Sequence, residues 1–234
     1  ILWYYIHSSG FTPALLTKFL KALYQHVECQ RSNWYNTATS NIRLSQEQAF
    51  TIAAIMYPEF VKSEEWLSEG ASAIANQLET QFLEDGVHNE FDISYHFGDT
   101  GLAAFTELYS IVSANDKLSL FPSDYKDKLY RATQFMKDVI YPNYSVDNFN
   151  DTRSQRVTKS VLLKNFRTYS SMFPEDPELM WIANQGAVGT KPSYRSKSYP
   201  AGGYYMLRTG WDSKDMMMIH KSNANVKGNW HCQP

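Results

Sequence analysis

The chain has 234 residues, of which 43% are hydrophobic and 20% are charged, and its formal net charge is −2. This composition is sufficient for a packed core, and the charge balance gives no support for nucleic acid or an anionic membrane as a partner. The apolar runs are too short to span a bilayer, so we also expect no membrane insertion.

Helical periodicity dominates the chain up to about residue 186. Thr12 and Pro13 are typical of an N-cap and a first helical position, and apolar residues then recur at spacings of three and four. A helix from about Leu44 is expected to end before Pro58, which cannot continue it. The same spacing predicts helices over residues 63–82, 100–113, 122–141 and 157–166, and a short one from residue 177. Antiparallel helix pairs of this kind are typical of a mainly α fold, either an (α/α) toroid or a helical array. The core face of the 63–82 helix is predicted to consist of Trp66, Leu67, Ala71, Ile74, Leu78 and Phe82.

The pattern changes after about Gly186. Residues 191–200 are polar and contain prolines, which is typical of a linker or long loop, whereas residues 202–211 read as a strand. A turn at residues 212–215 leads to a partner strand at 216–220. Because two strands alone are only marginally stable in water, we expect the start of a larger β-domain. The predicted division is a helical domain over residues 1–190, followed by a linker and the first β-strands over residues 191–234.

The segment from Asp85 to His96 is the richest in titratable side chains. It holds two histidines, three carboxylates and the adjacent Tyr95 and His96 within twelve residues. Loops on a rigid scaffold commonly carry catalytic groups, and acid–base chemistry needs such groups in one accessible cleft. A second polar cluster, residues 227–234, contains Trp230 and His231. These two clusters are the candidate functional segments.

Cysteine content and the chain ends set further expectations. Cys29 and Cys232 do not make a disulfide framework. A pairing across the fold remains open, but we expect two separate thiols. The first six residues have no preceding basic region and do not resemble a signal peptide. The chain starts without methionine in an apolar stretch and stops soon after His231, which we interpret as the middle of a longer protein. Its aromatic content of 15% is compatible with a sugar-binding cleft or with an aromatic core.

Four motifs occur in an order that resembles one family. They are Asn41 with Arg43, the segment 85–96, the strand 202–211 and the segment 229–231. Through them, residues 32–234 resemble the heparinase II/III family of polysaccharide lyases. The resemblance implies an incomplete (α/α) toroid followed by an antiparallel β-sandwich, with substrate in the cleft between them. It also implies a periplasmic or secreted lyase that acts on a sulfated glycosaminoglycan of the heparan sulfate type, and we expect a monomer.

The resemblance implies cleavage by β-elimination, in which the C5 proton of a uronate is removed and the sugar linked through O4 leaves. The uronate carboxylate must be hydrogen-bonded so that charge can spread onto its oxygens. The family pattern gives this role to Asn41, and Arg43 is close enough in sequence to bind a sulfate or carboxylate. From the residues alone, Ser40 or Asn41 as a simple helix cap remains open.

Tyr95 is the candidate acid and also a candidate base. A free phenol has a pKa of about 10, so a base of this kind needs a neighbour that stabilises phenolate. His96 is the adjacent candidate, but neighbours in an extended segment face opposite sides, so His231 is expected to face Tyr95. For glucuronate one tyrosine can serve as base and acid, because the C5 proton and the leaving oxygen lie on one face. For iduronate they lie on opposite faces, and His231 would either take the proton or help to hold the carboxylate. A purely structural role remains open for both histidines.

The remaining candidates are residues that would bind substrate. Glu90 and His88 either orient the catalytic pair, contact sugar hydroxyls or belong to a solvated loop. Trp34 either stacks on a sugar or packs in the core. Arg208 either faces a sulfate or forms a structural ion pair.

The sequence contains no HExxH or CxxC spacing, so we expect no metal or other cofactor here, although family members can carry a divalent metal in the β-sandwich. Two other functions remain open. The first is a glycoside hydrolase on an (α/α) toroid, with paired carboxylates drawn from Asp85, Glu90 and Asp92. The second is a non-catalytic glycan-binding module. An unsaturated uronide product would distinguish the lyase from the hydrolase.

Overall fold

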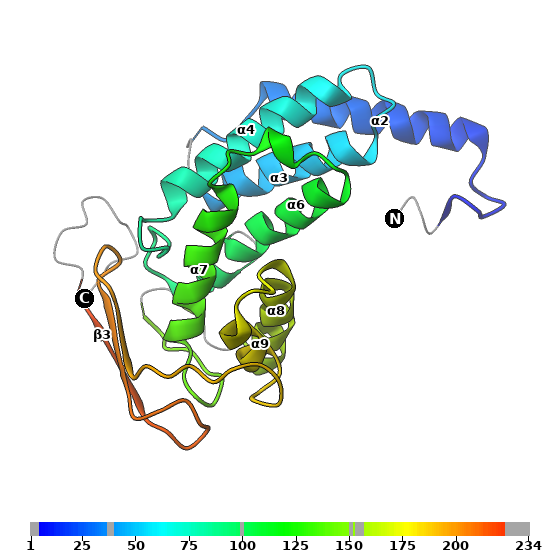
Figure 1. Ribbon diagram of the computed structural model, residues 1–234. Coiled ribbons are helices and arrows are strands. Elements are labelled where there is room, and N and C mark those ends of the chain that lie inside the picture. Colours follow the sequence, from blue (N-terminus) through cyan, green and yellow to red (C-terminus); the bar gives the residue numbers. More distant parts are fainter. Residues whose placement is uncertain (1–4, 37–39, 99–100, 150–151, 153–156, 223–234) are drawn as a thin grey trace.

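The computed structural model describes residues 5–36, 40–98, 101–149, 152 and 157–222. Helices come first along the chain and a small sheet follows them (Figure 1), which confirms the mainly α fold class. The helices are α2 (Pro13–Ser32), α3 (Asn41–Met56), α4 (Ser63–Gln81), α5 (Ile93–Phe97), α6 (Leu102–Ala114), the 3-10 helix η1 (Leu118–Leu120), α7 (Tyr125–Val139), α8 (Lys159–Met172) and α9 (Pro177–Ala183). The strands are β1 (Ser196–Tyr199), β2 (Tyr204–Arg208) and β3 (Met217–Lys221). Within the described ranges, no helix combines the length and apolar character needed to cross a bilayer.

Local sequence signals set several helix boundaries. Thr12 Oγ1 accepts a hydrogen bond from the Leu15 amide at 3.3 Å, and Pro13 is the first residue of α2, as predicted. α3 ends before Pro58, which was also predicted. α8 continues to Met172, beyond the predicted end at residue 166, because the buried Tyr169 extends its apolar face.

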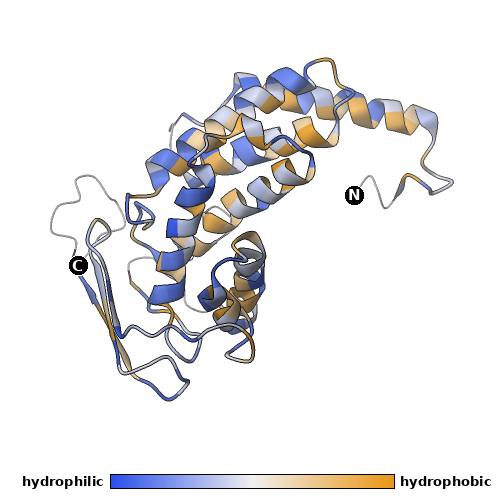
Figure 2. Cartoon of the chain, viewed as in Figure 1, coloured by the Kyte–Doolittle hydropathy of each residue, from blue (hydrophilic) through white to orange (hydrophobic). Residues whose placement is uncertain are grey.

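The helical core lies where α3, α4, α6 and α7 meet. α3 and α4 form an antiparallel pair joined by residues 57–62, and apolar residues line the faces along which these helices contact (Figures 1 and 2). The predicted core face of α4 is confirmed, because all of its members are buried: Trp66, Leu67, Ala71, Ile74, Leu78 and Phe82. Since the pair is antiparallel, the start of α3 lies at the same end as the loop that follows α4.

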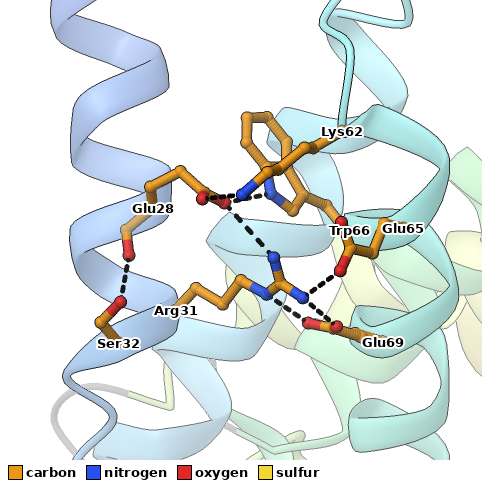
Figure 3. Close-up of polar contacts among 7 residues, drawn as sticks. All are labelled: Glu28, Arg31, Ser32, Lys62, Glu65, Trp66 and Glu69. Carbon is orange, nitrogen blue, oxygen red and sulfur yellow. Dashed lines mark hydrogen bonds and ion pairs between the residues drawn. The ribbon is translucent and has the colours of Figure 1, made fainter.

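α2 is joined to α4 by charged and polar side chains near its C-terminal end. Arg31 pairs with Glu65 and Glu69, and its Nε lies 2.8 Å from Glu69 Oε2 (Figure 3). Glu28 accepts a hydrogen bond from Trp66 Nε1 at 2.7 Å. The N-terminal turns of α2 extend away from the other helices (Figure 1), and their residues are exposed or half-buried.

The three strands form an antiparallel sheet in the order β1-β2-β3. The predicted pairing of the last two strands is confirmed. The interpretation of residues 191–200 as a linker or loop holds for residues 191–195 but was wrong for residues 196–199, which form β1. Tyr199 is the buried residue of β1, and the polar residues before it are exposed. An edge strand of this composition lacks the apolar alternation that identifies a strand in a sequence.

The sheet packs against the segment that precedes α5. Tyr204 Oη donates to Phe91 O at 2.7 Å, and the Gly202 amide donates to Asp85 Oδ2 at 2.9 Å. A Cβ on Gly202 would lie 2.4 Å from the Val87 side chain, so this close approach requires glycine. The division into domains at residue 190 stays a prediction. These hydrogen bonds connect the sheet, which follows that boundary, with the helical region, which precedes it.

Candidate functional site

The segment that carries the candidate acid contains the short helix α5. Asp92 Oδ1 caps this helix by accepting hydrogen bonds from the Ser94 amide at 2.7 Å and the Tyr95 amide at 3.0 Å. The expectation that Tyr95 and His96 lie in an extended segment was therefore wrong, and the missed signal was Asp92 as an N-cap. The helix turns His96 into the core and leaves Tyr95 half-buried.

His88 and His96 lie together in the core, with exposed fractions of 2% and 1%. His96 Nε2 lies 3.0 Å from Ala132 O, and its Nδ1 accepts from the His88 amide at 3.3 Å. His88 Nδ1 accepts from the Glu90 amide at 3.2 Å, and its Nε2 lies 3.1 Å from Gln81 Oε1. These partners assign the proton of each neutral ring to Nε2, because each Nδ1 accepts a backbone N–H.

Burial disfavours the charged form of both rings. It lowers the pKa of His96 to about 4, although the hydrogen bond to Ala132 O acts in the opposite direction. It lowers the pKa of His88 to about 3, and repulsion by His96 adds to the effect. Both rings are consequently neutral at physiological pH. Their contacts hold α5 against α7 and against the end of α4, so this geometry supports a positioning role for the pair.

Asn41 is the first residue of α3. Ser40 Oγ accepts the Arg43 amide at 3.1 Å, so Ser40 is the cap and the half-buried Asn41 side chain is not needed for that purpose. The Phe82 and His96 ring centroids are 5.3 Å apart, which places α5 beside the C-terminal end of α4. Because the start of α3 lies at that same end, the fold brings Asn41 and Tyr95 to one end of the α3–α4 pair.

Arg43 and Trp34 contact each other beside the start of α3. The guanidinium carbon of Arg43 lies 4.4 Å from the Trp34 ring centroid, and Arg43 Nε lies 2.5 Å from Oε1 of the buried Glu47. The Trp34 ring also makes an edge contact with Phe50, with centroids 5.2 Å apart. Trp34 is half-buried, so one part of its surface packs in the protein while another stays accessible.

Two of the three carboxylates of residues 85–92 bind backbone amides. Asp85 accepts the Val87 amide through Oδ1 and the Gly202 amide through Oδ2. Asp92 caps α5, and Glu90 is half-buried. A paired-carboxylate hydrolase needs acids that face a sugar, and two of the three candidate acids bind backbone amides instead.

Arg208 points away from solvent, with an exposed fraction of 8%. Its Nη2 donates to Asp138 O at 2.6 Å and to Ile140 O at 2.9 Å, and its guanidinium lies 3.8 Å from the Trp211 ring centroid. Tyr199 Oη donates to the buried Asp138 carboxylate at 2.7 Å. Arg208 was a candidate from the sequence, but its partners at the end of α7 were missed, because no local motif connects β2 with that segment.

His231 and the rest of the 227–234 cluster lie outside the described residues, as does Cys232. In the described part of the chain, no three His, Cys, Asp or Glu side chains gather into a group that could hold a metal ion. Asn41 and Tyr95 are therefore the two candidate catalytic residues that the fold places at a common end with accessible surface.

Comparison of the sequence with known protein families identifies the class to which this mainly helical architecture belongs. The chain belongs to the heparinase II/III family, because the family's sequence model, described as the heparinase II/III N-terminus, matches residues 1–181.

Individual relatives carry more specific names. The chain is 33% identical to a heparin-sulfate lyase of Bacteroides thetaiotaomicron, over 96% of this chain and 33% of the relative. It is 26% identical to a heparin-sulfate lyase of Pedobacter heparinus, over 98% of this chain and 34% of the relative. The chain thus spans about a third of the length of these curated relatives.

Solved structures show the same similarity. A heparinase III structure superimposes with a TM-score of 0.87 at 28% identity, covering 99% of this chain and 35% of the other. The heparan sulfate lyase HepC from Pedobacter heparinus gives a TM-score of 0.82 at 25% identity, with the same coverage. The fold of this chain is therefore found in about a third of each of those larger proteins.

Proposed function

We propose that this chain forms part of a polysaccharide lyase that cleaves heparan sulfate-type glycosaminoglycans by β-elimination. The observation that carries the proposal is the common placement of Asn41 and Tyr95 in a chain whose relatives are named heparin-sulfate lyases. The reaction needs a donor for the uronate carboxylate and an acid–base group near C5 and O4. An amide and a phenol meet these two needs.

In this proposal Asn41 donates a hydrogen bond to the uronate carboxylate. The bond strengthens as negative charge moves from C5 onto the carboxylate oxygens, which is the differential binding that accelerates a reaction. Tyr95 removes the C5 proton of a glucuronate and returns a proton to the departing O4. His231 takes the C5 proton where the uronate is iduronate. Electrons from the C5–H bond form the C4=C5 double bond as the C4–O4 bond breaks.

The buried histidines act indirectly in this scheme. His96 fixes α5 through Ala132 O, and α5 fixes the direction of the Tyr95 side chain. His88 accepts the Glu90 amide and thereby shapes the turn before α5. Arg43 and Trp34 would contact the sugar next to the uronate, and the Glu47 carboxylate holds the Arg43 guanidinium in place. A periplasmic or secreted location, expected from the resemblance, belongs to the same proposal.

The test is a product assay on the protein that carries this chain. Heparan sulfate, heparin, hyaluronan and alginate are incubated with the protein, and ultraviolet absorbance reports unsaturated uronide. We expect product from heparan sulfate, and we expect Tyr95→Phe to reduce kcat by about a hundredfold or more with little effect on binding. Hydrolysis products without absorbance would support the glycosidase instead, and binding without turnover in the unmodified protein would support a glycan-binding module.

A matched control separates chemistry from folding. Tyr109→Phe makes the same change at a half-buried tyrosine of α6, whose ring stacks with Phe121 and Tyr125, and should leave turnover unchanged. Equal turnover by Tyr95→Phe and Tyr109→Phe would remove Tyr95 from the mechanism.

A further inference from the structure

The peptide that joins Phe91 to Asp92 directly precedes α5, and the sheet binds it. Tyr204 Oη donates to Phe91 O at 2.7 Å, and Lys221 Nζ donates to the same oxygen at 2.7 Å. Tyr204 is the first residue of β2, Lys221 is the last residue of β3, and the two are paired in the sheet. A single carbonyl group before α5 is therefore held by two adjacent strands.

Phe91 has an unusual backbone conformation. Its φ is 52°, in the left-handed region, which a bulky residue adopts at a cost in free energy and keeps only where its surroundings hold it. The Phe91 side chain is 2% exposed, and its amide donates to His88 O at 2.9 Å. Strained residues of this kind cluster at functional sites. Because the Phe91 carbonyl accepts from Tyr204 and Lys221, the sheet is one of the partners that hold this conformation.

The position of α5 depends on this turn. Asp92 follows Phe91 directly and caps α5 by accepting hydrogen bonds from the Ser94 and Tyr95 amides. A rotation of the Phe91 backbone would move Asp92 and, with it, the start of the helix. Because α5 has only five residues, Tyr95 lies in its first turn. A displacement of the cap is therefore passed directly to the Tyr95 side chain.

Ring contacts keep both sheet donors in place. The Tyr204 ring centroid lies 5.0 Å from that of Phe135 on α7, and the Phe135 ring lies 4.8 Å from the His96 ring. Lys221 is half-buried, and its Nζ lies 5.2 Å from the Tyr204 ring centroid and 5.6 Å from that of Phe149. Such rings attract an ammonium group and restrict its position. The two donors are thus fixed well enough to constrain the turn before α5.

We propose that Tyr204 and Lys221 are positioning residues for Tyr95. By holding the Phe91 carbonyl, they fix the cap of α5 and therefore the place of the phenol. The consequence for the reaction rests on the proposed function, whereas the coupling of the sheet to α5 does not. Neither residue needs to contact the substrate, because a reacting group displaced by about 1 Å already loses much of its effect on the rate.

The first test removes one hydroxyl group from the protein that carries this chain. Tyr204→Phe deletes a donor to Phe91 O but keeps the ring that packs on Phe135. We expect kcat toward heparan sulfate to fall by about tenfold with KM nearly unchanged, because Tyr95 moves and no assigned substrate contact is lost. We also expect hydrogen exchange of the Ser94 and Tyr95 amides to become about tenfold faster, because the cap holds these protons.

Tyr199→Phe is the matched control. It removes a buried hydroxyl group from the same sheet, which donates to Asp138 at 2.7 Å, and it keeps the ring. This variant should have a lower free energy of unfolding, but its kcat and the exchange of the two α5 amides should not change. Equal effects of Tyr199→Phe and Tyr204→Phe on kcat and exchange would show that Tyr204 acts only on stability, and the proposal would then be wrong.

Lys221 is tested by rescue. Lys221→Met removes the ammonium group and should lower kcat, whereas Lys221→Arg retains a donor for Phe91 O and should restore most of the rate. Equal rates for these two variants would contradict a positioning role for Lys221.

Amide exchange and turnover together separate this proposal from the proposed function. Faster exchange of the α5 amides in Tyr204→Phe with unchanged kcat would overturn the positioning of Tyr95. The same faster exchange in a protein whose unmodified form makes no unsaturated uronide would support the coupling of the sheet to α5 and would contradict the proposed function instead.

Discussion

The junction of α2 with α4 and the junction of the sheet with the helices each centre on an arginine, but the two arginines have opposite surroundings. Arg31 has a side chain that is 24% exposed and pairs with Glu28, Glu65 and Glu69 (Figure 3). Arg208 is 8% exposed and donates to two backbone carbonyls. We call these the α2 junction and the sheet junction.

The difference determines how much each contact contributes. At the α2 junction water can replace any partner that Arg31 loses, so each ion pair adds little to stability. At the sheet junction no water replaces a lost donor, so each hydrogen bond carries the full cost of desolvation. Loss of the Arg208 side chain should therefore destabilise the protein more than loss of the Arg31 side chain.

The largest effect is expected from Arg208→Met. This change leaves Asp138 O and Ile140 O buried without their donor and removes the contact with Trp211. We expect the free energy of unfolding to fall by about 3 kcal/mol, measured by urea denaturation. A fall no larger than that of Arg31→Met would show that the two junctions do not differ as proposed.

A second effect concerns acid. His96 is neutral in the fold with a pKa lowered to about 4, whereas its ordinary value is 6.5. As the pH falls below 6.5 the unfolded chain therefore binds a proton that the folded chain refuses, and stability is lost until the pH reaches about 4. Between pH of about 7.5 and 5, this group alone should lower the free energy of unfolding by about 2 kcal/mol. His88, with its pKa lowered to about 3, adds a loss of the same sign.

The measurement is a set of urea denaturation curves across that pH range. His96→Gln removes the titrating ring, so its stability should depend less on pH than that of the unmodified protein. His26→Gln makes the same substitution at an exposed histidine of α2 and controls for the change of residue type. Parallel curves for His96→Gln and the unmodified protein would contradict a buried neutral ring at this position.

Much of the fold follows from local patterns. The face of α4 from Trp66 to Phe82 was predicted because its apolar spacing matches one side of a helix, and all six residues are buried. α5 and β1 were missed because they are short. The first depends on one capping carboxylate, Asp92, and the second depends on pairing with β2, which a polar edge sequence does not reveal.

Less of the candidate site than of the fold could be predicted from the sequence. Asn41 and Tyr95 could be selected from the sequence because their residue types and order follow a family pattern. The buried state of His88 and His96 could not, because it depends on Gln81 and Ala132 in other helices. Arg208 was a candidate for sulfate, but its surroundings are assembled from β2, α9 and the segment after α7, which lie far apart in the chain.

The smallest effect is expected from Arg31→Met. The variant loses three carboxylate partners, yet Glu28 keeps its contacts with Lys62 and with Trp66 Nε1, so α2 stays attached. We expect the free energy of unfolding to fall by less than about 1 kcal/mol at low salt. At about 1 M salt the difference from the unmodified protein should nearly vanish, because salt screens half-exposed charges. The loss of stability in Arg208→Met should persist at that salt concentration. The Arg208 guanidinium is buried, and the carbonyl oxygens that accept its hydrogen bonds carry no charge. If the Arg31→Met difference also persisted, the α2 junction would depend on packing of the arginine stem rather than on its charge.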